Sequence, residues 1–227
     1  MGIPLSGVDA ISSVLWSQRK SRIETVMISH ADADHFNAVP GILDRFNVGC
    51  VLVGPNMFDD SSDAVAKLHA DIADAGISSK TICKGTRLSV DQAVSCRLLH
   101  PSPFRRFQSD NENSLVLEII YGQFRVLLPG DVERAGMHDL LLLSPEPVDV
   151  LMAPHHGSRH SSPTEFSKWS SPRFTVISAG RKSLPETEVT TRAYGNYGRV
   201  LHTHTHGAIS VTIWPDDLEV DHFLKQP

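Results

Sequence analysis

Histidine and aspartate, the residue types that bind catalytic divalent metals, are concentrated at a few points of this sequence. Four of them fall within six residues, directly after an apolar run: His30, Asp32, Asp34 and His35. Imidazole and carboxylate groups together suit zinc, manganese or iron better than calcium. This spacing predicts a metal site, in preference to a polar loop in which Asp34 caps the helix that follows.

Two further polar groups also come after apolar runs. Asp131 follows Gly130, and a carboxylate in such a position can bridge two cations. His155 and His156 lie between Pro154 and Gly157, and adjacent side chains point in different directions. One of the two is therefore expected to bind metal, and the other to orient it or to contact substrate. The structural alternatives are an ordinary Gly-Asp turn and a surface turn.

A third histidine group consists of His202, His204 and His206. If this segment is a strand, alternation places all three side chains on one face. An accessory metal site, or the rim of a site, is one interpretation. The favoured alternative is an exposed strand end in which the histidines occur by chance, because no carboxylate partner is obvious nearby.

Apolar patterns predict the elements that must position these groups. Residues 1–22 have no clear period and are expected to be an irregular N-terminal segment, followed by one domain at 23–227. Strands outnumber the short helices between them, which favours a layered α/β sandwich over a doubly wound parallel sheet. The predicted strands are 22–29, 48–53, 94–99, 114–121, 124–128, 148–153, 174–178 and 207–214, and the predicted helices are 37–46, 62–75, 133–143 and 164–169.

Composition limits the class of protein. The 227 residues are 41% hydrophobic and 21% charged, which fits a globular domain with a substantial core. The net charge of −5 differs from that of a strongly basic nucleic-acid binder, so any phosphate binding has to be local. Three cysteines without CxxC spacing argue against a disulfide framework and a cysteine zinc site. With no membrane-length apolar run and no signal pattern, we expect a soluble, cytoplasmic protein.

The order of these motifs resembles the metallo-β-lactamase superfamily. SHADADH, NENSLVL, LLPGD and DVLMAPHHGS follow one another in the segment from about residue 23 to residue 211. Within the superfamily, the chain is most similar to the hydrolase domains of ComEC-type competence proteins, which are DNA-uptake channels, because Asp32 stands at the second ligand of the usual HxHxDH motif. The resemblance implies a metallo-β-lactamase-type αββα sandwich, without the membrane channel.

The resemblance also implies roles for individual residues. One or two zinc or manganese ions would hold a hydroxide that attacks a phosphodiester or another electrophile. Asp34 and His156 would be catalytic, with Asp34 orienting the hydroxide. The implied metal ligands are His30, Asp32, Asp34, His35, Asp131 and His155. The expected substrate contacts are Asn113, Ser158 and Arg159.

Two departures from the family pattern keep several functions open. Asn113 stands where many members have a histidine ligand, and the opening hairpin of the family is not recognisable, so the chain is interpreted as N-terminally shortened. The first hypothesis is a phosphodiesterase or nuclease-like hydrolase acting on DNA or a small phosphodiester. The second hypothesis keeps the fold and the metal but changes the substrate to a small ester, lactone or thioester. The third is a non-catalytic relic domain that binds a partner.

Overall fold

The protein has a mixed α/β fold, as the sequence predicts. A computed structural model describes residues 7–59, 62–180 and 184–224. The chain divides into two compact units, residues 1–82 and 83–227, so the boundary falls inside the segment 23–227 that the sequence analysis treats as one domain. Among the residues described, no helix combines the length and the apolar character needed to cross a membrane.

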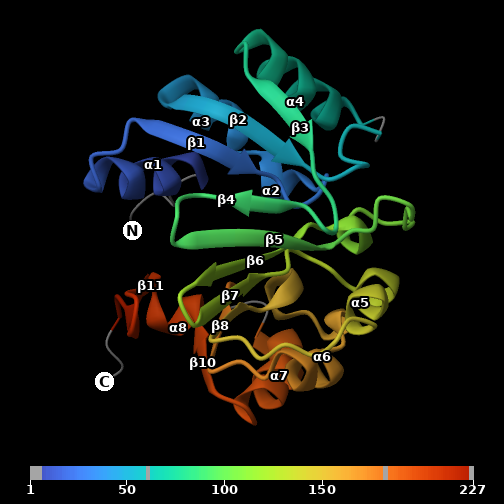
Figure 1. The fold of residues 1–227 in the computed structure, drawn as a ribbon, viewed down its shortest axis with the longest axis vertical. Helices are drawn as coiled ribbons and strands as arrows, with labels where there is room; N and C mark the ends of the chain where they lie inside the picture. The colour runs from blue at the N-terminus through green and yellow to red at the C-terminus, as the bar shows by residue number, and fades with distance from the viewer. Residues whose placement is uncertain (1–6, 60–61, 181–183, 225–227) are drawn as a thin grey trace. The chain divides into compact units, whose positions relative to one another are not determined.

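The first unit contains one parallel sheet, in the order β1-β2-β3, with helices beside it (Figure 1). Val51, Leu52 and Val53 on the central strand are all buried, and because successive side chains point to opposite faces, this end of the strand is covered on both. The elements of this unit are α1 (Gly7–Ser17), β1 (Arg22–Met27), α2 (Ala33–Phe36), α3 (Val39–Arg45), β2 (Asn47–Val53), α4 (Asp63–Asp74) and β3 (Ser78–Thr81).

Helix α4 follows the pattern that the sequence predicts for residues 62–75. The hydroxyl oxygen of Ser62 accepts a hydrogen bond from the backbone N–H of Val65 at 3.3 Å, which caps the first turn. One face of the helix then buries Val65, Leu68 and Ile72. Local signals and core packing agree in this helix.

Helix α1 corrects the expectation of an irregular N-terminal segment. Val8 and Leu15 pack against a small core formed by Ile42, Phe46 and Val48. The guanidinium of Arg45 also binds the Asp9 carboxylate at 2.8 Å. The helical period is obscured in the sequence because other apolar side chains of α1 are exposed, namely Ile11, Val14 and Trp16.

The second unit contains a seven-stranded sheet in the order β10-β9-β8-β7-β6-β5-β4, and a separate hairpin, β11-β12. Strands β4 to β7 are antiparallel, whereas β7 to β10 are parallel. The elements are β4 (Arg87–Ser89), β5 (Val94–His100), η1 (Asn111–Asn113), β6 (Val116–Tyr121), β7 (Phe124–Leu128), α5 (Arg134–Leu141), β8 (Val150–Met152), η2 (Pro154–Gly157), η3 (Arg159–Ser161), α6 (Pro163–Ser170), β9 (Phe174–Ile177), α7 (Leu184–Gly195), β10 (Arg199–His202), α8 (Thr203–His206), β11 (Ile209–Ile213) and β12 (Leu218–His222).

The parallel half of this sheet determines where its polar loops lie. Helices α5, α6 and α7 contribute Met137, Phe166 and Tyr194 to a core that also includes Leu127 and Leu151 of the strands. The carboxyl ends of parallel strands share one edge of a sheet, which is where α/β proteins place their ligands. The segments that follow β7, β8, β9 and β10 begin at this edge (Figure 1).

Candidate functional site

Two histidines of the second unit face one carboxylate. Asp131 follows β7, and His155 and His156 follow β8 within η2. The Nε2 atom of His155 lies 3.9 Å, and that of His156 3.7 Å, from the same oxygen, Oδ2 of Asp131. Ligand atoms around a tetrahedral zinc ion are about 3.4 Å apart, since each lies about 2.1 Å from the metal. The two separations are only a few tenths of an ångström longer, so each histidine, taken with Asp131, has a spacing compatible with a shared divalent ion.

The other ring nitrogen of each histidine is held by an acceptor. The Nδ1 atom of His155 lies 2.9 Å from the carboxylate of Glu133, and the Nδ1 atom of His156 lies 3.0 Å from the carbonyl oxygen of Ser178. Because carboxylate and carbonyl oxygens only accept, both Nδ1 atoms carry the proton and donate it. Each Nε2 lone pair is then left to face Asp131, the arrangement found around metal-binding histidines.

Glu133 is a functional candidate that the sequence analysis missed. It is buried, with 7% of its surface exposed, and lies just before α5. Its signal in the sequence is a second acid, two residues after Asp131. Metal-binding histidines are commonly oriented by a carboxylate. The position of Glu133, however, depends on a turn that the sequence pattern does not specify.

The backbone of the two histidines is strained. His155 has φ of 48° and His156 has φ of 54°, a left-handed region that residues other than glycine rarely occupy. Hydrogen bonds hold this turn in place: His155 N–H donates to Gly130 O at 3.2 Å, and the Thr190 hydroxyl donates to Gly157 O at 2.7 Å. Strain of this kind persists where the surroundings enforce it, and it clusters at functional sites.

A cavity of about 290 Å³ adjoins the two histidines. Ser158 and Arg159, two of the predicted substrate contacts, line it together with His155 and His156. The Ser158 hydroxyl oxygen accepts from His160 N–H at 3.2 Å and caps η3. The structure therefore brings these two predicted contacts beside the histidines.

Asn113, the third predicted substrate contact, is engaged by its own loop. Its amide group donates to the carbonyl oxygens of Phe107 and Ser109, and its side-chain oxygen accepts from Phe107 N–H. These bonds give Asn113 a structural role, and a substrate contact for it stays a prediction. The neighbouring Ser114 hydroxyl accepts from the backbone N–H of Asp131 at 3.1 Å and so positions that residue.

The His/Asp motif of the first unit follows β1. The Ser29 hydroxyl lies 3.0 Å from Nδ1 of His30 and 3.2 Å from Nδ1 of His35, and the two rings are 4.2 Å apart between centroids. Asp34 is exposed, and its carboxylate lies 3.8 Å from Nε2 of His35. Asp32 is the residue that caps α2, through a 2.8 Å bond from Ala33 N–H. The next helix, α3, for which Asp34 was the predicted alternative cap, has Ala38 at its N-cap position and no side-chain cap.

The third histidine group does not form a strand. Residues Thr203–His206 make the short helix α8, so the condition for placing all three side chains on one strand face is not met. The favoured alternative, an exposed strand end, is wrong as well, because His206 lies in this helix and is buried. His202 binds the Thr191 hydroxyl at 3.0 Å, and His206 packs against His222. Burial, together with the neighbouring His204 and His206, lowers the pKa of His202.

Comparison with known proteins finds relatives among competence proteins. The chain is 26% identical over 192 residues to ComE operon protein 3 of Bacillus subtilis, 26% over 201 residues to Recombination protein 2 of Haemophilus influenzae, and 26% over 197 residues to competence protein ComA of Neisseria gonorrhoeae. These matches cover 83%, 87% and 83% of this chain, which spans about a quarter of the length of each relative. The predicted resemblance to ComEC-type competence proteins is confirmed.

No family model matches the chain. Among solved structures, a zinc-bound PqqB from Methylobacterium extorquens aligns with a TM-score of 0.47 and 12% sequence identity. The alignment covers 79% of this chain and 71% of that one.

Proposed function

We propose that this chain is a metal-dependent hydrolase that uses one or two divalent ions. The observation that carries the proposal is the pair of Nε2 atoms, on His155 and His156, that face one oxygen of Asp131. The fixed Nδ1 protons support it further, because they leave both nitrogens available to a metal. The proposed ligands are the side chains that the sequence predicts: His30, Asp32, Asp34, His35, Asp131 and His155. His156 is the proposed catalytic histidine, and its Nε2 atom is the alternative to that of His155 beside Asp131.

The donor atoms fit zinc or manganese. Imidazole nitrogen and carboxylate oxygen suit these ions better than calcium. When bound, such an ion polarises an electrophile and lowers the pKa of water, so that hydrolysis proceeds near neutral pH. Glu133 keeps His155 in the orientation that binding needs, and the exposed carboxylate of Asp34 is the proposed acceptor of a proton during the reaction.

A phosphodiester is the substrate class that we favour. The relatives are competence proteins and a recombination protein, which favours DNA or a fragment of it. Arg159 lines the cavity beside His155 and His156, and a guanidinium group matches the geometry of a phosphate. An ester, lactone or thioester is the alternative, since the same ion polarises a carbonyl group equally well.

Metal analysis and a matched substrate screen test the proposal. The purified protein, reconstituted with zinc or manganese, is expected to retain metal and to cleave bis-p-nitrophenyl phosphate and single-stranded DNA. Asp131→Asn should lose both properties. Asp216→Asn, an exposed aspartate between β11 and β12, has the same change in charge and should keep them.

The other outcomes separate the alternatives. Cleavage of p-nitrophenyl acetate without cleavage of either phosphodiester would replace the phosphodiesterase with an ester hydrolase. A protein that retains no metal after reconstitution and cleaves none of the three substrates would overturn the enzyme proposal, and would favour a domain that only binds a partner.

A further inference from the structure

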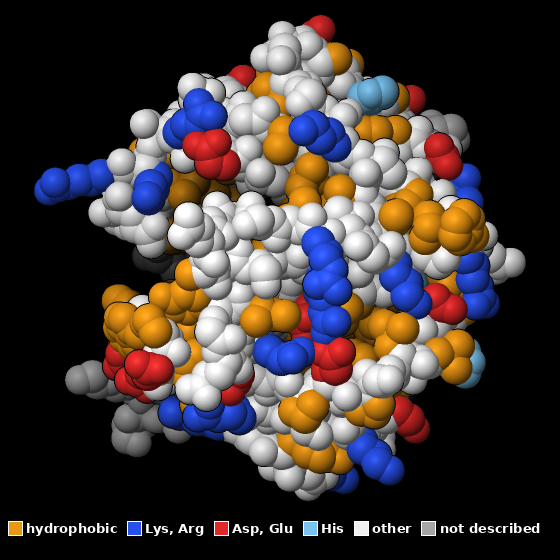
Figure 2. All heavy atoms as spheres, in the orientation of Figure 1, with side chains coloured by type: hydrophobic (Ala, Val, Ile, Leu, Met, Phe, Trp, Pro, Cys, Tyr) orange, Lys and Arg blue, Asp and Glu red, His pale blue; other side chains and the backbone are white. Residues whose placement is uncertain are grey.

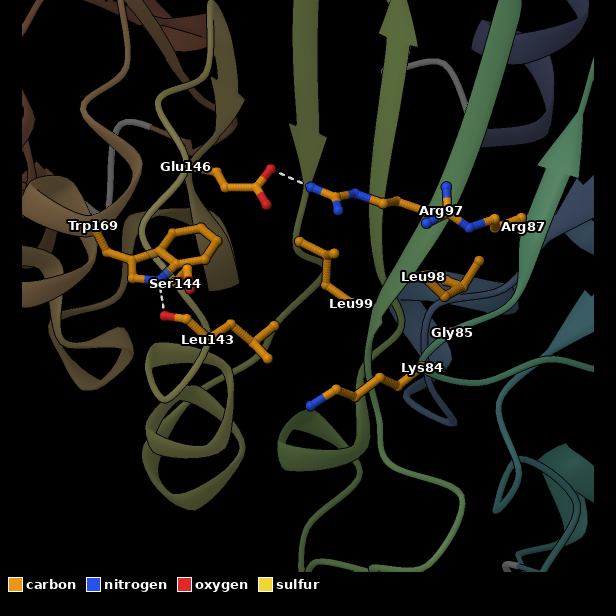
Figure 3. A pocket seen from close by; sticks show the side chains of 10 residues that line it. All are labelled: Lys84, Gly85, Arg87, Arg97, Leu98, Leu99, Leu143, Ser144, Glu146 and Trp169. Atoms are coloured by element: carbon orange, nitrogen blue, oxygen red, sulfur yellow. Dashed lines mark hydrogen bonds and ion pairs between the residues drawn. The ribbon is translucent and has the colours of Figure 1, made fainter.

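The second unit has another cavity, which shares no residue with the one beside the histidines. Its volume is about 300 Å³. Figure 3 shows Arg87 and Arg97 reaching it from neighbouring strands, Lys84 from the segment before β4, and the ring of Trp169 from α6 on the opposite side. None of the predicted metal ligands or substrate contacts lines it.

Part of the charge around this cavity is balanced by ion pairs. Arg97 binds the carboxylates of Glu118 and Glu146, and Arg125 binds the same two carboxylates, with 3.2 Å between Arg125 Nη1 and Glu118 Oε1. Two guanidinium groups therefore face two carboxylates. This network neutralises itself, and Glu146 adds no net negative charge to the cavity.

Lys84 and Arg87 supply positive charge that the network does not balance. Within the described part of the chain, neither takes part in an ion pair. Arg87 stands directly opposite Arg97 in the register of β4 and β5, and like charges in that position are unfavourable. Figure 2 shows several Lys and Arg side chains near the middle of one face, with Asp and Glu side chains among them. An anion bound beside Arg87 and Lys84 would balance the charge of these two cations.

The opposite wall of the cavity is formed by Trp169 and Leu143, with the polar side chains of Ser144 and Glu146 beside them. The indole N–H of Trp169 donates to Leu143 O at 3.0 Å, and the ring stacks on Phe166 with 5.7 Å between centroids. Leu99 and Leu143 line the cavity next to this ring (Figure 3). A flat apolar group is the shape that such a wall accommodates.

We propose that this cavity binds a nucleoside monophosphate, with its phosphate at Lys84 and Arg87 and its base toward Trp169. A phosphate carries up to two negative charges, which matches the two unbalanced cations. The volume is at the lower limit of roughly 300–1,000 Å³ for cavities that hold small organic ligands, so a single nucleotide fits and a longer strand does not. The proposal does not depend on hydrolase activity, because the cavity contains none of the proposed metal ligands.

Calorimetric titration of the metal-free full chain with deoxyadenosine monophosphate tests the proposal. Binding is expected, and the double variant Lys84→Met, Arg87→Met should weaken it by about ten- to a hundred-fold, the effect of losing charged hydrogen bonds. Arg192→Met together with Lys168→Met removes the same charge from α7 and α6, at two residues that do not line the cavity, and should leave the affinity unchanged.

Thermal unfolding gives a second readout that does not require tight binding. Without ligand, Arg87→Met should unfold at the same temperature as the wild type or higher, since it removes a like-charged pair. With the nucleotide, only the wild type should be stabilised. A stabilised Arg87→Met variant would contradict the phosphate contact.

Three comparison ligands identify which part of the nucleotide is recognised. Inorganic phosphate or benzoate binding as tightly as the nucleotide would overturn the proposal in favour of a general anion site. Deoxyadenosine binding equally well, with no effect of the double variant, would overturn it in favour of an apolar cavity. Absence of binding to the wild type at millimolar nucleotide would also reject it.

Discussion

The proton positions on the rings of His155 and His156 decide whether these histidines can donate hydrogen bonds to the Asp131 carboxylate. Glu133 and Ser178 each accept a hydrogen bond from one ring, donated by the Nδ1–H groups of His155 and His156. The Nε2 atoms are thereby prevented from donating to Asp131 while the rings are neutral. The 3.7 Å and 3.9 Å separations, longer than hydrogen bonds, agree with this assignment.

Replacing Glu133 with glutamine tests the importance of that orientation. The amide oxygen can still accept from His155 Nδ1, so the geometry is retained while the negative charge is lost. We expect metal affinity to fall about ten- to a hundred-fold, with little change in unfolding temperature. Competition with a chromophoric chelator measures the affinity. Glu165→Gln, at an exposed position in α6, is the control, and equal affinities in the two variants would contradict the role of Glu133.

His100 makes the stability of the second unit depend on pH. Its side chain is 1% exposed, its Nδ1 atom donates to Ser114 O at 2.9 Å, and its Nε2 atom has no hydrogen-bond partner. Burial lowers the pKa of His100 below its ordinary value of 6.5. The unfolded chain then binds more protons than the folded one at mildly acidic pH. This contribution to stability is fully present above pH 6.5 and is lost as the pH falls below that value.

Substitution of His100 by asparagine should reduce this dependence. Asparagine can keep a donor near Ser114 O but does not titrate, so urea midpoints should decline less between neutral and mildly acidic pH than in the wild type. Some decline remains, because burial also lowers the pKa of His202. The exposed His138→Asn is the control. If the His100→Asn midpoints decline as steeply as those of the wild type, the dependence has another origin.

At the scale of elements, the contact between α5 and η1 holds the Asp131 segment in place. A Cβ atom added to Gly136 would lie 2.2 Å from the carbonyl oxygen of Glu112, which is backbone and cannot move alone. Gly136→Ala should therefore destabilise the protein by about 1–3 kcal/mol, although alanine is the better helix former. Because Ser114 follows Glu112 closely and binds Asp131 N–H, metal affinity should fall as well.

Gly195→Ala is the matched control for the change at Gly136. Gly195 ends α7, and a Cβ atom there would meet no heavy atom within 4 Å. Thermal or urea unfolding of both variants checks the stabilities, and a chelator titration checks the metal affinities. If the two variants have the same stability, the close approach of α5 to η1 has no energetic importance.

Elements with a strong apolar period are the ones that the sequence predicts well. Helix α4 combines a cap at Ser62 with three buried apolar residues, and β7 was predicted with its observed bounds, Phe124–Leu128. Helix α7 has no such period: it buries Thr187 and Thr190, whose hydroxyl groups need partners that only the folded unit supplies. Strand β3 is exposed along its whole length and has no apolar signal.

In the candidate site too, local sequence patterns predicted some residues, whereas contacts made only in the folded chain determine the others. The spacing of Asp131, His155 and His156 after apolar runs predicted residues that the fold does bring together. It did not reveal that Asp32 caps a helix, or that Glu133 binds His155. Both facts depend on the backbone turn that follows a strand, and several turns are compatible with the same sequence pattern.

Charge across the whole molecule limits how nucleic acid can bind. The net charge is −5, and on the face in Figure 2 the Lys and Arg side chains are interspersed with Asp and Glu. Nonspecific affinity for DNA depends on neutralising phosphates with cations, so this protein should bind a strand weakly unless it recruits positive charge locally. A divalent ion at the Asp131 carboxylate would supply such charge.

Binding of single-stranded DNA should therefore depend on metal. Fluorescence anisotropy of a labelled, uncleavable phosphorothioate oligonucleotide should show weak binding in the presence of a chelator and tighter binding with manganese. Asp131→Asn should remove the increase, whereas Asp216→Asn should retain it. The metal-dependent part should also weaken as salt is added, because phosphates exchange their counterions for the protein. Tight binding in chelator, unaffected by Asp131→Asn, would instead locate the DNA on a surface unrelated to the metal ligands.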